Sequence, residues 1–239
     1  MSDDGSTERN AYGQPVGPRV ADWQPRALPE SPVLNGRYCR LERLAPEHHG
    51  AALGKLLADD TEPQDWTYMP FGPFESPEAG ERWVDVFSKD AGFIYYAIVD
   101  PDAGAPTGIA AYLRVKPAAG SIEIGGILFS RTLMKTAAAT EALFLLIDHA
   151  FSLGYRRCEW KCDALNTPSM RAARRLGFRD EGVFRKALVV KGRNRDTAWF
   201  AMTDDDWGGL RAGYLAWLDP ANFDADGQQR SRLGDHLPG

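Results

Sequence analysis

The pattern of hydrophobic and polar positions predicts a chain that alternates between strands and helices from residue 37 to residue 218. Apolar residues at every second position predict strands at 37–44, 93–99, 108–115, 122–129, 155–162, 181–190 and 197–202. Apolar residues at helical spacing predict helices at 46–58, 76–87, 136–151, 166–176 and 204–218. This order predicts an α/β fold with a mixed sheet and helices on both faces.

The predicted strand 122–129 contains two adjacent glycines, Gly125 and Gly126. Glycine in a strand packs no side chain and marks a bulge or a ligand lying close to the backbone. We therefore expect a gap in the sheet at this strand. Simple alternation places Glu123 on the face opposite Ile122, Ile124 and Leu128.

A run of small residues, 136–139, opens the helix that follows this strand. The first turn of a helix has backbone N–H groups without intrahelical partners and carries partial positive charge, so small side chains there let a phosphate approach. An alanine-rich first turn also arises from helix propensity alone, so both interpretations stay open. Asn166 and Pro168 then begin the helix at 166–176 as a cap and a first-turn proline.

The second half of the chain resembles a known family. The residues that carry the resemblance are Asn166, Ser169, Ala172, Leu176-Gly177-Phe178 and Glu181-Gly182, after the helix start Thr140-Glu141-Ala142-Leu143. This run resembles the acetyl-CoA-binding core of the GNAT N-acetyltransferases, in the branch that acetylates the N-termini of ribosomal proteins. The resemblance spans residues 36–217. It implies a GNAT-like, mostly antiparallel sheet of about seven strands with a splayed central strand pair.

The resemblance also implies acetyl-CoA as co-substrate and direct acetyl transfer to a primary amine, on a protein or peptide N-terminus or a small amine. The residues it assigns to acetyl-CoA are Ile127, Leu128, Phe129, Arg131, Lys135, Thr136, Ala137, Ala138, Ala139 and Asn166. Met134 and Ala137 depart from the phosphate loop of the family, which has a charged residue and a glycine there. Alanine fits at residue 137 if the backbone is right-handed helical, and Lys135 or Arg131 then supplies the charge.

Acetyl transfer needs a base for the amine, donors for the oxyanion and an acid for the thiolate. Glu123 is the candidate base, with an ordinary solvated strand residue as the alternative. Ser169 matches the position of the family's hydroxyl acid, although serine also suits the first turn of a helix.

The aromatic loop 66–74 contains Trp66, Tyr68, Met69 and Phe71, with too much proline and glycine for regular structure. It is either a hydrophobic lid over the core or a wall of the acceptor pocket, and the two interpretations are compatible.

The net charge of −5 and pI of about 5.4 argue against binding to nucleic acid or to an anionic membrane. No apolar run or signal peptide is evident, so a cytoplasmic protein is expected. Three scattered cysteines predict core residues rather than disulfides or a metal site.

Composition divides the chain into an N-terminal arm at 1–32, a single domain at 33–219 and a polar tail at 220–239. The assembly is expected to be a monomer or a homodimer. Two alternatives to an enzyme remain at this stage. One is a non-catalytic acyl-CoA-binding module, and the other is a protein-interaction module that uses the aromatic loop and the arms.

Overall fold

One eight-stranded sheet forms the body of the molecule in the computed structural model, which describes residues 8–238. The strand order is β3-β4-β5-β6-β7-β8-β10-β9, and only β7 and β8 are parallel. The strands are β3 (Val33–Asn35), β4 (Arg40–Arg43), β5 (Phe93–Val99), β6 (Pro106–Lys116), β7 (Ser121–Phe129), β8 (Arg157–Asp163), β9 (Arg179–Val190) and β10 (Arg193–Thr203). The predicted mixed, mostly antiparallel sheet is confirmed. The sequence pattern missed β3, whose three residues are too few for alternation to show.

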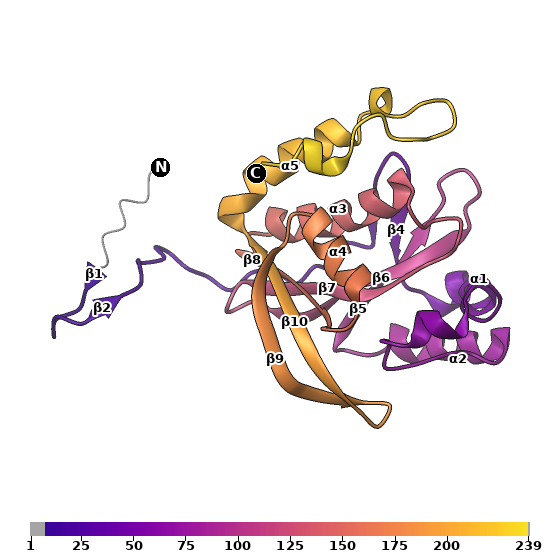
Figure 1. Ribbon diagram of the computed structural model, residues 1–239, viewed down its shortest axis with the longest axis horizontal. Helices are drawn as coiled ribbons and strands as arrows, with labels where there is room; N and C mark the ends of the chain where they lie inside the picture. Colours follow the sequence, from indigo (N-terminus) through magenta and orange to yellow (C-terminus); the bar gives the residue numbers. More distant parts are fainter. Residues whose placement is uncertain (1–7, 239) are drawn as a thin grey trace.

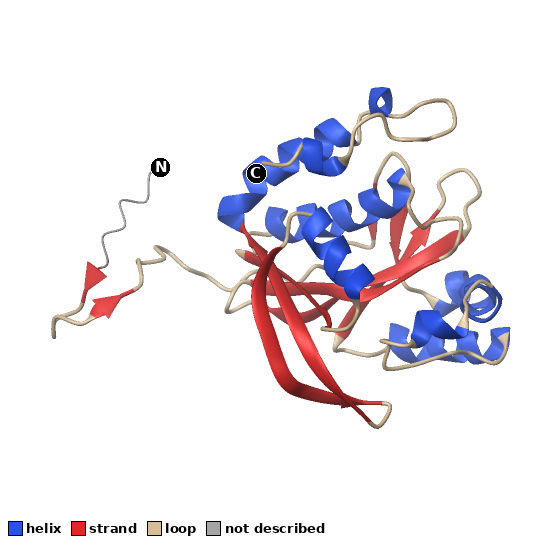
Figure 2. Ribbon diagram, in the orientation of Figure 1, coloured by secondary structure: helices blue, strands red, loops and turns tan. Residues whose placement is uncertain are grey.

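Helices cover both faces of this sheet (Figures 1 and 2). α1 (Pro46–Asp59) and α2 (Pro77–Ser88) pack on one face, and α3 (Ala137–Ser152) and α5 (Asp204–Trp217) lie on the other, beside the short α4 (Thr167–Arg175). A hydrophobic cluster fills each side. Within residues 8–238, no helix combines the length and the apolar character needed to cross a bilayer.

A bulge in β7 reverses its alternation. Ile109 of β6 pairs with Leu128, but Ala111 pairs with Gly125, so β7 contains one residue more than β6 in this interval. Ile122 and Ile124 consequently lie in the cluster under α3, whereas Leu128 lies in the cluster under α1 and α2. The expectation that Leu128 shares a face with Ile122 and Ile124 was wrong, because the extra residue changes the phase of the strand.

The parallel pair β7 and β8 separates partway along its length. Its register runs from Ser121 opposite Arg157 to Ile124 opposite Trp160, and pairing stops there although β7 continues to Phe129 and β8 to Asp163. The bulge begins at the next residue of β7. The predicted splayed central pair is therefore present, at the strand with the two glycines.

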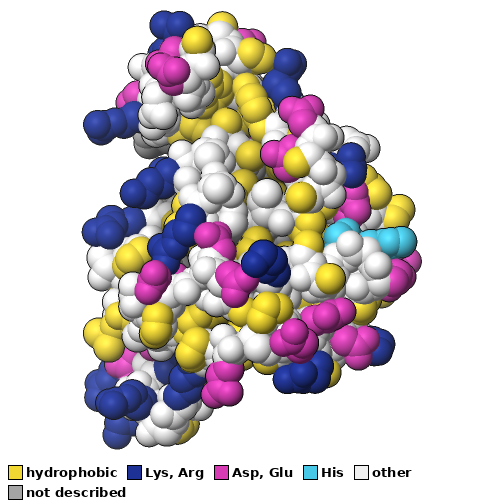
Figure 3. Space-filling view, turned by 90° about the vertical axis from the view of Figure 1, so that its right-hand side faces the viewer, with side chains coloured by type: hydrophobic (Ala, Val, Ile, Leu, Met, Phe, Trp, Pro, Cys, Tyr) yellow, Lys and Arg dark blue, Asp and Glu magenta, His cyan; other side chains and the backbone are white. Residues whose placement is uncertain are grey.

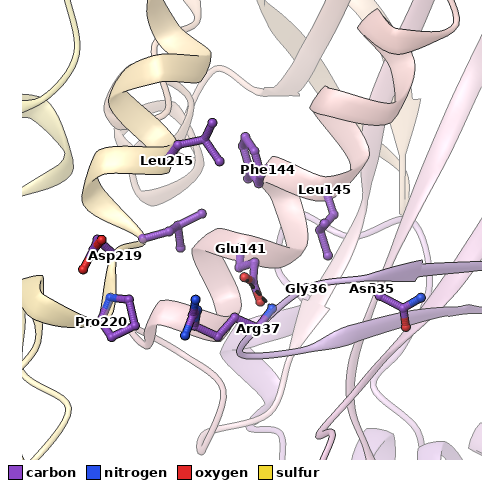
Figure 4. Close-up of a pocket in the computed structure, with 10 residues that line it drawn as sticks. Asn35, Gly36, Arg37, Glu141, Phe144, Leu145, Leu215, Asp219 and Pro220 are labelled. Carbon is purple, nitrogen blue, oxygen red and sulfur yellow. Dashed lines mark hydrogen bonds between the residues drawn. The ribbon is translucent and has the colours of Figure 1, made fainter.

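Glu141 of α3 delays the start of the strand predicted at 37–44. Its buried carboxylate accepts the N–H groups of Arg37 (2.8 Å), Tyr38 (2.6 Å) and Cys39 (2.9 Å), so these residues turn toward α3. Figure 4 shows Arg37 beside Glu141. Backbone groups bound to a side chain are unavailable to a sheet ladder. Regular pairing of β4 with β5 accordingly begins at Arg40.

Both terminal segments contribute contacts to the body. β1 (Glu8–Arg9) and β2 (Pro15–Val16) form a small hairpin that projects away from it (Figure 1), but Trp23 Nε1 donates to Ala118 O at 2.8 Å. At the other end, η2 (Pro220–Asn222) and η3 (Leu233–Asp235) fold back along α5, where Leu233 is buried. The domain thus includes apolar anchors from the predicted arm and tail.

Because Glu141 accepts three backbone N–H groups, its removal is predicted to destabilise the fold. Glu141→Ala leaves three backbone donors without their acceptor in a buried turn, so we expect a loss of about 3 kcal/mol in the free energy of unfolding, measured by urea denaturation. Asp148→Ala is the matched control on the same helix, because Asp148 pairs only with the half-exposed Arg211 at 2.7 Å. We expect a loss below about 1 kcal/mol for the control. Equal losses in the two variants would contradict the assignment.

Candidate active site

The candidate site lies where β7 and β8 diverge, and its side chains point to both faces of the sheet. Glu123 and Glu159 face each other across the two strands, on the side that carries α1 and α2. One residue farther along, Ile124 and Trp160 form the last pair and point into the α3 side. A molecule entering the opening can therefore reach groups from both faces.

Glu123 is buried between two cations. Its side chain is only 5% exposed, Lys161 Nζ lies 3.1 Å from its Oε2, and the guanidinium of Arg114 pairs with the same oxygen. A solvated strand residue, the alternative reading of Glu123, is therefore excluded. Burial raises the pKa of Glu123, and the charges of Arg114 and Lys161 lower it in part.

Lys161 holds this part of the site together. The ammonium also contacts Glu159 at 2.5 Å and lies 3.5 Å from the centre of the Trp199 ring on β10. Because Lys161 is the first residue of β8 beyond the last pair with β7, its bond to Glu123 links the two strands below the opening. Sequence analysis did not assign Lys161 or Arg114. Their only distinguishing feature in the sequence is a positive charge on a strand in the middle of the predicted sheet.

The ion pairs continue outward to the edge of the sheet. Arg157 contacts Glu159 at 2.8 Å and Glu181 of β9 at 2.7 Å. Every carboxylate in this row has a cationic partner, so the surroundings of Glu123 are not strongly acidic. On the side of the molecule drawn in Figure 3, Lys, Arg, Asp and Glu side chains likewise lie among hydrophobic ones.

Ser169 sits on the opposite side of the opening. Trp160 Nε1 donates to Ser169 Oγ at 3.1 Å, and Asn166 Oδ1 accepts the N–H of Ser169 at 3.1 Å. The indole N–H binds one lone pair of the hydroxyl, so Ser169 keeps its own O–H as a donor. Cys162 is a further neighbour of Ser169. Burial raises the pKa of the Cys162 thiol, and the hydrogen bond from Ser169 lowers that pKa in part.

The start of α3 has the backbone that a phosphate-binding turn requires. Lys135 has a φ of +64°, Thr136 caps the helix by accepting the N–H of Ala139 at 3.2 Å, and Ala137 is the first helical residue. The alanine at 137 is therefore free of strain, because the left-handed residue is Lys135. Within residues 8–238, the N–H groups of Ala137 and Ala138 have no acceptor.

The two basic candidates near this turn differ in their surroundings. Arg131 NH2 lies 2.7 Å from Asp65 Oδ2, and Arg131 N donates to Asp60, so this residue binds the segment after α1. Lys135 forms no ion pair within the described part of the chain. Lys135 is thus the better candidate for an anion at the start of α3.

The aromatic loop behaves mainly as a lid over the core. Trp66, at the end of η1 (Pro63–Trp66), is 1% exposed and packs edge-on against Phe71 and Phe74. Lys191, at the tip of the β9–β10 hairpin, donates to the carbonyl oxygens of Trp66 (3.0 Å), Phe71 (3.2 Å) and Gly72 (2.9 Å). The loop and the hairpin therefore meet over the face that contains Glu123. Tyr68 and Met69 are half-buried in the same loop.

Two cavities lie beside α3 but away from the opening. One, of about 300 Å³, is lined by Arg37, Phe144, Leu215 and Asp219 between α3 and α5 (Figure 4). The other, of about 170 Å³, is lined by Tyr38, Asp100, Thr107 and Thr136. Neither includes a residue of β8 or α4, and the smaller one borders Thr136 and Ala138 at the start of α3.

The environment of Glu123 generates a titration prediction. Lys161→Met removes one of the two cations that lower the pKa of Glu123, so we expect that pKa to rise further. The measurement is the carboxyl carbon shift of Glu123 against pH by NMR. Lys161→Arg keeps the charge and Lys89→Met removes an exposed, distant one, and both should leave the midpoint near that of the unaltered protein. A midpoint that does not rise in Lys161→Met would contradict the direct pairing.

Comparison with known proteins agrees with this geometry. Residues 39–179 match the family model described as "Acetyltransferase (GNAT) domain". The chain is similar to the crystal structure of a GCN5-related N-acetyltransferase from Brucella melitensis, with 43% identity and a TM-score of 0.88 over 91% of this chain and 99% of the other.

A further similarity is to the uncharacterized N-acetyltransferase p20 of Bacillus licheniformis, at 27% identity over 62% of this chain and 85% of that protein. A putative ribosomal-protein-serine acetyltransferase from Vibrio cholerae shares the fold, with 17% identity and a TM-score of 0.60 over 74% of this chain and 99% of the other. The match to the family model over residues 39–179 and the 43% identity to the Brucella melitensis structure show that the chain belongs to the GNAT family of acetyltransferases.

Proposed function

We propose that this acetyltransferase transfers acetyl directly from acetyl-CoA to a primary amine, on a peptide N-terminus or a small molecule. The observation that carries the proposal is the opening between β7 and β8, with Glu123 on one face and Ser169 on the other. A base on one side and an acid on the other suit an amine and a thiol that arrive and leave by different faces.

Acetyl-CoA fits the groups around the opening. The N–H groups of Ala137 and Ala138 at a helix start suit its pyrophosphate, and Lys135 supplies positive charge beside them. Asn166 uses its oxygen to cap α4, and its amide N–H groups have no partner within the described residues, so they can donate to the pantetheine arm. The backbone of Ile127, Leu128 and Phe129 borders the opening after the bulge.

The mechanism follows from the two faces. The neutral amine attacks the thioester carbonyl carbon, and Glu123 takes the proton that the nitrogen loses. The carbonyl oxygen becomes an oxyanion, the C–S bond then breaks, and Ser169 gives its proton to the departing sulfur. Water then carries the proton from Glu123 to Ser169, so both side chains return to their starting states and the products are an amide and CoA thiol.

The acceptor approaches on the face with Glu123. The aromatic loop 66–74 and the tip of the β9–β10 hairpin border this face and are joined by Lys191. An amine at the end of a narrow chain suits such an approach better than an amine on a folded surface. This favours an extended peptide N-terminus or a small amine. Tyr68, Met69 and Phe71 are the residues of the aromatic loop that we expect to contact it.

The direct test of the function is a binding and turnover experiment. Acetyl-CoA at about 100 times its Kd should stabilise the protein by about 2.7 kcal/mol and raise Tm, because it binds only the folded state. A panel of peptides and small amines should then release CoA thiol. Binding without release for any acceptor would favour the non-catalytic acyl-CoA module. No change in Tm with any CoA derivative would favour the protein-interaction module.

The roles of Glu123 and Ser169 are separated by pH. We expect Glu123→Gln to lower kcat/KM by ~10²-fold, with the larger loss at low pH where little amine is neutral. Ser169→Ala should lower it by a similar ~10²-fold where thiolate departure limits the rate. CoA affinity and Tm, measured in parallel, control for misfolding. Near-normal rates in both variants across the pH range would make these residues structural.

A further inference from the structure

The hydroxyl of Tyr95 is a buried polar group without a partner in the residues that the structure describes. The side chain is 3% exposed, and its Oη has neither a hydrogen bond nor contact with solvent. An unsatisfied buried hydroxyl costs about 1–3 kcal/mol, so such a group calls for an explanation. The proposed roles of Glu123 and Ser169 do not involve this hydroxyl.

Tyr95 lies in one row with the bulge of β7. Tyr95 of β5 pairs with Ala111 of β6, and Ala111 pairs with Gly125 of β7. Because Ala111 and Gly125 have little or no side chain, the ring of Tyr95 can extend across β6 as far as β7. Glu123 belongs to the next row of the same face, opposite Leu113.

The ring end of Tyr95 meets the backbone of Gly126. A Cβ at residue 126 would lie 2.9 Å from Cε1, 3.0 Å from Oη and 3.2 Å from Cζ of Tyr95, and these are its three nearest neighbours. Gly126 also has a φ of +59°, which side chains rarely adopt. The hydroxyl therefore occupies the space beside the bulge that a larger residue would take.

The packing of the ring fixes where the hydroxyl points. Phe93 stacks on Tyr95 at 5.4 Å between ring centres, and Trp83 packs edge-on at 5.6 Å. These contacts need only the ring, so phenylalanine would satisfy them equally well. Packing thus accounts for an aromatic residue at position 95 but leaves the hydroxyl unexplained.

We propose that the Tyr95 hydroxyl donates a hydrogen bond to the carbonyl oxygen of the acetyl group at the bulge, and so stabilises the oxyanion formed during transfer. The proposal rests on the proposed function. When the amine nitrogen bonds to the carbonyl carbon, the C=O electron pair moves to oxygen and the hydroxyl holds that charge. When the C–S bond breaks, the pair returns to C=O, and Tyr95 keeps its proton throughout.

The surroundings of Tyr95 suit a donor that stays neutral. Burial raises the pKa of Tyr95, with a smaller contribution from the charge of Asp90, so the phenol remains protonated at working pH. The charged groups on the neighbouring rows are the carboxylates Glu123 and Glu159 and the cations Arg114 and Lys161, so the two signs balance. Since the hydroxyl is closed to solvent, the side chains around it must move when the acetyl group arrives.

The test is Tyr95→Phe, which keeps the ring and removes the hydroxyl. We expect kcat to fall by ~10²-fold with the acceptor KM unchanged, because one donor to an oxyanion has an effect of this size. Tm should stay constant or rise, since no bond is lost. The matched control is Tyr96→Phe. Tyr96 is the adjacent buried tyrosine, and its hydroxyl donates to Ser31 O at 2.8 Å. The Tyr96→Phe variant should have a lower Tm and an unchanged kcat.

A spectroscopic measurement tests the contact without turnover. The carbonyl stretch of acetyl-CoA labelled with ¹³C at the carbonyl should move to lower frequency when it binds the unaltered protein and Tyr96→Phe. In Tyr95→Phe most of this shift should disappear. An unchanged rate and stretch in Tyr95→Phe, or an effect on acceptor KM alone, would overturn the role of Tyr95 and leave the acetyltransferase function intact. Failure of the unaltered protein to bind acetyl-CoA would overturn both.

Discussion

The structure of the site depends on one constraint, the extra residue in β7 at the point where β8 leaves it. That residue shifts the phase of β7, so Leu128 packs under α1 and α2 whereas Ile122 and Ile124 pack under α3. It also ends the ladder with β8 after Ile124 and Trp160. A regular strand at this position would close the sheet and leave no passage between its faces.

Electrostatic balance is the second determinant of the site. Glu123 loses solvation by burial, which alone would favour its neutral form, and the adjacent Arg114 and Lys161 favour the charged form. The pKa of the carboxyl is thus governed by two opposing effects of the fold. Lys161 affects both the pKa of Glu123 and the geometry of the site, because the same ammonium bridges β7 and β8 and packs on the Trp199 ring.

Most of the fold could be predicted from the sequence, since long strands and helices have clear periodicity. The five main helices and seven of the eight sheet strands lie where alternation and helical spacing place them. Periodicity does not reveal an inserted residue, so the side of Leu128 was wrong. Periodicity also does not show which face of a sheet is covered by helices. The sequence therefore allows a solvated Glu123, whereas the structure buries this residue. Arg114 and Lys161 come from different strands, and only their register brings them together.

The hydrogen bonds of Lys191 allow the hairpin and the aromatic loop to change in evolution independently of the strands beneath them. One ammonium at a hairpin tip holds three carbonyl oxygens of the aromatic loop, and none of these atoms belongs to the strands that hold Glu123 or the bulge. Substitutions or insertions in the hairpin can therefore reshape the entrance while the reacting centre stays in place. Under the proposed function, selectivity and chemistry lie on separate segments, joined through main-chain oxygens that no side-chain substitution can remove.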